Sequence, residues 1–247
     1  MFGATPGRLP TAIDGEVAGV TLPAGRHVRA DEGEGAVVAW ISVDLLSADE
    51  LNDLIPRLAA VFPDTGLWPL QARGLDRGNL DRPWASGEMD GPVGEIPDVL
   101  PVLTRRRPAG PDVAAVAALA PPVPGPDMPA GQPLTVDAAG LMLVPVSRPA
   151  DVPAALGWQG AMNYGYSGAD HTAVLRSWED RFGAVVLSLG FDTMRVWVAR
   201  GPETVDQIEG VLREHFAYCP DNIDYPIDAD TYRARLAQGS YWSFWWD

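Results

Sequence analysis

The most regular pattern of apolar positions begins at residue 170. Four apolar side chains recur at helical spacing and share one face: Val174, Leu175, Trp178 and Phe182. Asp170 is a preferred residue type for a helix N-cap, and Gly183 is suited to the left-handed conformation that ends a helix. The pattern therefore predicts a helix that begins at Asp170 and ends before Gly183.

Two strands are predicted directly after this helix. Residues 184–189 are apolar at nearly every position, which is typical of a central strand covered on both faces. In residues 194–199, apolar positions alternate with a second set that contains Arg195 and Trp197. The short turn between the two segments predicts an antiparallel hairpin.

A second helix is predicted after the hairpin. Thr204 and Gln207 have the spacing of a capping box. The apolar stripe that follows is Val205, Ile208, Leu212 and Phe216. The order helix, strand, strand, helix predicts an α+β fold in which helices cover an antiparallel sheet in the C-terminal half.

The N-terminal half predicts a smaller unit of mixed α/β character. Residues 15–42 alternate between strand-like stretches and turns, and Ser47 with Glu50 marks the start of a helix. Residues 67–70 predict a short strand, and Pro69 favours an edge position because proline cannot donate to a sheet.

Composition suggests three segments in the chain. Residues 105–135 are rich in proline, alanine and glycine and are interpreted as a linker. They separate an N-terminal α/β half, residues 1–104, from a C-terminal α+β domain, residues 136–247. Within the first half, residues 73–95 lack periodicity and predict a long loop.

The charge of the chain narrows the classes of partner. The net charge is −15, and all 18 basic residues are arginine. An acidic chain is unlike a nucleic-acid binder, but it suits a basic protein partner. The absence of lysine suggests a GC-rich genome, such as that of an actinobacterium.

No apolar run has the roughly 20 residues of a membrane span, and the first residues lack the pattern of a secretory signal. We therefore expect a cytoplasmic protein.

Four motifs, in the same order, resemble the domain of unknown function 4253 family. They are LVPVSRPADVPAALGW, AVLRSWEDRFGAVVLSLGFDTM, EHFAYCPDNI and the terminal WSFWWD, and together they cover roughly residues 140–247. The stretch TGLWPL, residues 65–70, is similar to the upstream part of such proteins. The resemblance implies an actinobacterial type of protein, and it implies no catalytic residue.

His171, Asp170 and Cys219 are the candidates for catalysis. A histidine beside a carboxylate can act as a general base, and a lone cysteine can act as a nucleophile. The competing interpretation is a helix cap with its neighbour and a buried thiol. His215, Cys219 and Asp221 are the candidates for a metal site, because the first two are four positions apart and would share one face of a continuing helix. No HExxH or CxxC motif supports a metal, no glycine-rich phosphate loop is present, and no cofactor is expected.

The C-terminal part of the chain is rich in tryptophan and tyrosine. Core packing explains some of these side chains, and others are expected on an exposed face, where Trp and Tyr are common in interfaces. The candidate binding residues are Tyr164, Tyr166, Arg195, Trp197 and Trp245. We therefore predict a protein-interaction or immunity-like binding module, with a protein partner or a homodimer. The alternative is a small enzyme or a small-molecule sensor with a cleft lined by His171, Asp170 and Cys219.

Overall fold

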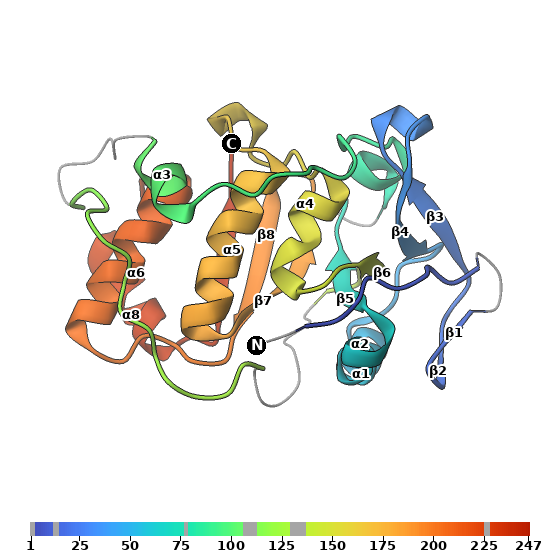
Figure 1. The fold of residues 1–247 in the computed structure, drawn as a ribbon, viewed down its shortest axis with the longest axis horizontal. Helices are drawn as coiled ribbons and strands as arrows, with labels where there is room; N and C mark the ends of the chain where they lie inside the picture. Colours follow the sequence, from blue (N-terminus) through green and yellow to red (C-terminus); the bar gives the residue numbers. More distant parts are fainter. Residues whose placement is uncertain (1–2, 12–14, 77–78, 106–112, 129–136, 225–227) are drawn as a thin grey trace.

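A seven-stranded mixed sheet forms the centre of the protein in a computed structural model that describes residues 3–11, 15–76, 79–105, 113–128, 137–224 and 228–247 (Figure 1). The strands, in their order across the sheet, are β3 (Gly25–Arg29), β4 (Val37–Ser42), β6 (Gly140–Pro145), β5 (Leu67–Ala72), β7 (Ala184–Leu189), β8 (Thr193–Val198) and β9 (Tyr241–Trp245). A separate hairpin pairs β1 (Glu16–Val17) with β2 (Val20–Thr21).

The sheet is mostly antiparallel, and one pair of strands is parallel. That pair is β5 with β7, where Gln71 and Ala72 lie beside Ser188 and Leu189. Strand β6 lies between β4 and β5, so strands from both predicted halves alternate within one sheet. The predicted α+β class is confirmed, and the three-segment division at residues 105–135 stays a prediction.

Eight α-helices and four short helical turns surround the sheet in the described residues. The α-helices are α1 (Ala48–Ala60), α2 (Phe62–Thr65), α3 (Val99–Thr104), α4 (Val152–Leu156), α5 (Gly168–Phe182), α6 (Val205–Tyr218), α7 (Asp221–Asp224) and α8 (Ala229–Gln238). The short turns are η1 (Asp31–Gly33), η2 (Asp81–Ala85), η3 (Pro149–Asp151) and η4 (Met162–Tyr164). None of the described helices has both the length and the apolar character needed to cross a membrane.

Helices cover both faces of the sheet. Trp178 of α5 packs on Trp242 and Phe244 of β9, with centroid distances of 5.4 and 5.3 Å. Figure 1 shows α4 and α5 side by side on this face. On the other face, α1 packs against β5, and Ile55 of α1 lines the same hollow as Trp197.

The hairpin and the helices after it agree with the sequence pattern, except at one helix start. Ser167 is the N-cap of α5, and its hydroxyl accepts the backbone N–H of Asp170. The prediction of Asp170 as the cap was wrong, because Asp170 is the third residue of the helix and its carboxylate accepts the Ser167 N–H. A capping box has an acidic residue at this third position, so the local sequence fits either assignment.

Strand β5 corrects a second expectation. It lies between β6 and β7 rather than at an edge, and all of its residues are buried. Pro69 pairs with Leu143 of β6, whereas pairing with β7 begins only at Gln71. The missing N–H of proline is therefore tolerated in a central strand, because β5 has a neighbour on only one side at that position.

Strand β9 is an edge strand whose outer backbone groups are capped by a side chain. The amide of Asn222 donates to the carbonyl of Ser243 and accepts the N–H of Trp245 at 3.2 Å. The side chain thus takes the place of a neighbouring strand, which protects the edge from pairing with another chain.

Candidate functional site

His171 lies in the core and not in a cleft. Its side chain is fully buried, and its Nδ1 forms a hydrogen bond of 2.5 Å with the Tyr218 hydroxyl. Burial lowers the pKa of His171 to about 3, so the imidazole is neutral at pH 7. Within the described part of the chain, its Nε2 has no hydrogen-bond partner. The ring packs between aromatic neighbours, with Trp158 at 4.8 Å and Trp246 at 5.3 Å between centroids.

Asp170 and Cys219 have structural contacts of their own. Asp170 forms a bidentate ion pair with Arg105, at 2.6 and 3.2 Å. The thiol of Cys219 donates to the carbonyl of Trp245 at 3.0 Å, and burial raises the pKa of this thiol to about 12. None of the three catalytic candidates lines the pockets described below. The enzyme or sensor alternative is therefore not favoured.

We expect Cys219 to be unreactive in the folded protein. The thiolate is the reactive species, and burial together with the raised pKa leaves almost none of it at neutral pH. Alkylation by iodoacetamide at pH 7.5, followed by mass spectrometry, would give no labelled native protein and full labelling in denaturant. Fast labelling of the native protein would contradict this placement.

The residues predicted to bind a metal form hydrogen bonds with different side chains. His215 is buried, and its Nδ1 lies 2.9 Å from the Tyr232 hydroxyl, while Trp178 and Trp242 pack on its ring. Asp221 accepts the Tyr164 hydroxyl. Among the described residues, no group of three or more His, Cys, Asp and Glu side chains has a metal-binding arrangement.

Most of the aromatic binding candidates belong to the core. Tyr166 is buried and donates to the carbonyl of Ala217, and Tyr164 is half-buried. Trp197 is only 6% exposed and stacks on Tyr241. Two candidates line the same hollow of the surface: Trp245, which is 43% exposed, and Arg195, which is half-buried.

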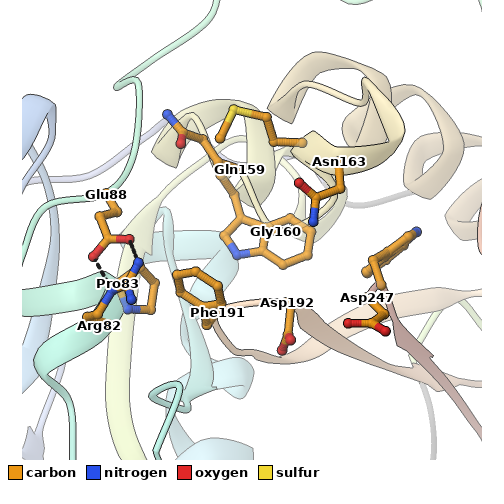
Figure 2. Close-up of a pocket in the computed structure, with 12 residues that line it drawn as sticks. Arg82, Pro83, Glu88, Gln159, Gly160, Asn163, Phe191, Asp192 and Asp247 are labelled. Atoms are coloured by element: carbon orange, nitrogen blue, oxygen red, sulfur yellow. Dashed lines mark hydrogen bonds and ion pairs between the residues drawn. The ribbon is translucent and has the colours of Figure 1, made fainter.

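A surface pocket of about 320 Å³, the Phe191 pocket, lies where four segments meet (Figure 2). Its lining residues come from the 82–88 loop, the 158–163 segment, the β7–β8 turn and the segment after β9. They are Arg82, Pro83, Glu88, Trp158, Gln159, Gly160, Met162, Asn163, Phe191, Asp192, Trp246 and Asp247. The pocket thus combines three aromatic rings with carboxylates and amides.

One side of the Phe191 pocket already holds a guanidinium. Arg82 forms a bidentate ion pair with Glu88 at 2.6 and 2.7 Å, and its Cζ lies 4.7 Å from the centre of the Phe191 ring. Figure 2 shows this pair beside Phe191, and the amides of Gln159 and Asn163 lie farther along the pocket. Hydrogen bonding to Arg82 lowers the pKa of Glu88, so Glu88 is charged at neutral pH.

The indole N–H groups of the two tryptophans in the pocket already donate hydrogen bonds within the protein. Trp158 donates from Nε1 to the carbonyl of Gly190 at 2.9 Å, and Trp246 donates to the carbonyl of Tyr218 at 3.1 Å. Both side chains are almost fully buried. They provide a rigid apolar floor, and the polar recognition falls to the carboxylates and amides.

A second hollow of about 530 Å³, the acidic depression, adjoins the Phe191 pocket. The two share Glu88 and Gln159, and the amide of Gln159 donates to Asp90 at 2.5 Å. We call the two together the acidic groove. Its acidic lining residues are Asp31, Glu32, Glu34, Glu88, Asp90, Asp192 and Asp247, and its basic lining residue is Arg82.

Sequence reasoning missed this groove. The 73–95 loop was expected, but its partner segments are far away in the chain: residues 31–34, 158–163, 191–192 and 246–247. The one signal in the sequence was the acidic run ADEGEG, residues 30–35, which lies among the turns predicted within residues 15–42. Its residues Asp31 and Glu32 adopt positive φ angles of 50° and 54°.

Comparisons with known proteins show that part of the chain is similar to a family, and they assign no function. Searches of curated proteins and of solved structures found no significant match. Residues 140–247, which include β6–β9 and α4–α8, match a family model, and this match confirms the resemblance that the four motifs indicated. The C-terminal part of this chain is accordingly similar to the family described as Domain of unknown function (DUF4253).

Proposed function

We propose that the protein is a non-catalytic binding module that recognises a basic protein partner through the acidic groove. The observation that carries the proposal is the charge of the groove, where, among the residues that the structure describes, seven acidic residues are accompanied by one arginine that is already paired with Glu88. This interpretation keeps the predicted interaction module and changes its surface from the Trp/Tyr face to the groove.

Charge complementarity supports a cationic partner. A concave surface lined by one sign of charge concentrates the opposite charge and accelerates encounter. The net charge of −15 acts in the same direction at long range. An immunity-like role, in which the protein neutralises a basic effector, fits this chemistry. A homodimer stays a prediction, and it would have to use another surface because two copies of the acidic groove repel each other.

The Phe191 pocket supports an arginine or lysine side chain as the anchor. The ring of Phe191 already has the Arg82 guanidinium on it, so its environment suits cations. Asp192 and Asp247 lie in the same pocket and form no ion pair with the described residues. A partner guanidinium would find carboxylates, an aromatic ring and a floor of nearly buried indoles in one place.

The first test is calorimetric titration with an arginine-rich peptide. We expect binding that weakens as salt is raised, because the charges of the groove are screened. The double variant Glu32→Gln/Glu34→Gln removes two exposed charges from the groove and should weaken binding roughly tenfold, or about 1.4 kcal/mol.

The matched control has the same change of charge at another place. Glu203 and Asp206 are exposed at the start of α6, and neither lines the groove. The variant Glu203→Gln/Asp206→Asn should bind the peptide as the wild type does. Equal weakening in both double variants would show that only the net charge matters, and the proposal would fail.

Phe191 tests the anchor pocket separately. The variant Phe191→Leu keeps an apolar side chain and loses the aromatic face, so it should weaken the peptide by about two- to fivefold, the size of an exposed cation–π contact. An acidic peptide without lysine or arginine is the control, and it should show no measurable binding to the wild type or to the variant. Unchanged affinity for the arginine-rich peptide would remove Phe191 from the site.

A further inference from the structure

A separate hollow, which lies over strands of the sheet, contains arginine side chains. A hollow of about 220 Å³, the arginine pocket, lies over β7, β8 and β9 and contains Arg73 and Arg195. Arg73 follows the end of β5, and Arg195 lies between Ser188 and Ser243 in the strand register. The hydroxyl-bearing residues Ser188, Thr193 and Ser243 line the hollow, and the exposed Trp245 also lines it.

The two guanidiniums lack a full counter-charge within the described residues. Arg195 forms no hydrogen bond or ion pair with any of them. Nη2 of Arg73 is buried and has no partner in that part of the chain, while its Nη1 lies 3.4 Å from Asp137, whose side chain is 65% exposed. Partly burying two neighbouring cations with so little counter-charge is unfavourable, and a bound anion would offset this cost.

The electrostatics of Arg195 agree with this geometry. Burial is the main cause that lowers its pKa, and the charge of Arg73 lowers it further, against weaker opposing effects of Asp137 and Tyr241. Two neighbouring cations in a chain of net charge −15 are therefore held together against mutual repulsion. An anion between them would relieve both the repulsion and the desolvation.

The number of donors favours a tetrahedral anion. The two guanidiniums and the hydroxyls of Ser188, Thr193 and Ser243 exceed what the two oxygens of a carboxylate can accept, and a phosphate offers three or more oxygens. A hollow of about 460 Å³ shares Arg73 and Thr193 with this pocket and leaves room for the rest of a molecule. We propose that the arginine pocket binds the phosphate group of a small phosphorylated molecule.

Calorimetric titration with inorganic phosphate, at constant ionic strength set with chloride, tests the proposal. We expect saturable binding of phosphate and at least tenfold weaker binding of acetate. Arg195→Gln and Arg73→Gln should each weaken phosphate at least tenfold. Arg57→Gln should leave it unchanged, because Arg57 pairs with Asp53 on the exposed side of α1 and is the matched control.

Stability without phosphate separates a binding role from a structural one. Because Arg195 is unpaired within the described residues and repelled by Arg73, we expect the melting temperature of phosphate-free Arg195→Gln to equal or exceed that of the wild type. Phosphate should then raise the melting temperature of the wild type only. The proposal is overturned by a lower melting temperature of the variant without phosphate, by equal binding of acetate, or by the absence of phosphate binding to the wild type. None of these results affects the test of the acidic groove.

Discussion

Replacing Glu214 by leucine is expected to lower the free energy of unfolding by about 3–5 kcal/mol, the usual cost of leaving one member of a buried ion pair alone. Glu214 is fully buried and accepts two hydrogen bonds from Arg181, at 2.7 and 2.8 Å. It also accepts the indole N–H of Trp178 and the backbone N–H of Ala120. Urea unfolding followed by tryptophan fluorescence measures the loss.

Two further variants show whether the ion pair is the cause. Glu209→Gln removes a half-exposed carboxylate of the same helix that pairs with Arg233, and it should cost no more than about 1 kcal/mol. The double variant Arg181→Met/Glu214→Leu should recover part of the loss, since an apolar pair leaves no unpaired charge. A loss below about 1 kcal/mol in Glu214→Leu would contradict the buried network.

Acid is expected to destabilise the protein between about pH 6.5 and pH 3 through His171 and His215. Both are buried, and burial lowers the pKa of each, to about 3 for His171 and well below the usual value for His215. In this window the unfolded chain binds protons that the folded protein does not, so stability is full above pH 6.5 and falls as the pH is lowered. His171 costs about 1.4 kcal/mol per pH unit, or about 2 kcal/mol between pH 6.5 and pH 5, and His215 adds a loss of stability in the same direction.

The measurement is urea unfolding at pH 7, 6 and 5 for the wild type and for His171→Phe. The variant should lose about half of the histidine-dependent slope, whatever its stability at pH 7. His27→Gln is the matched control, since His27 is exposed on β3, and it should keep the full slope. An identical slope in the wild type and in His171→Phe would show that His171 is not responsible.

Local patterns predicted the elements of the C-terminal part because each signal lies within a few residues. The helix 205–218 begins at the capping box of Thr204 and Gln207, and the apolar run 184–189 predicted the fully buried strand β7. Pro69 was misjudged because its tolerance depends on where β7 begins to pair with β5. That information lies more than one hundred residues away in the chain.

The candidate site was much less accessible to sequence reasoning. His171 and Cys219 were singled out for their chemistry, but burial among aromatic rings makes the first neutral and the second unreactive. Arg195 and Trp245 were singled out because they alternate with apolar residues on strands, and their role in binding stays a prediction. The acidic groove could not be found, because Asp31, Glu88 and Asp192 come together only through long-range contacts of three loops.

An NMR titration of the isotope-labelled protein with an arginine-rich peptide directly tests whether a basic partner binds in the acidic groove. We expect the largest chemical-shift changes at residues of the acidic groove, such as Glu34, Gln159 and Phe191, and we expect these changes to disappear at high salt. Shift changes that are spread evenly over the acidic surface, or concentrated away from the groove at α6, would contradict this expectation.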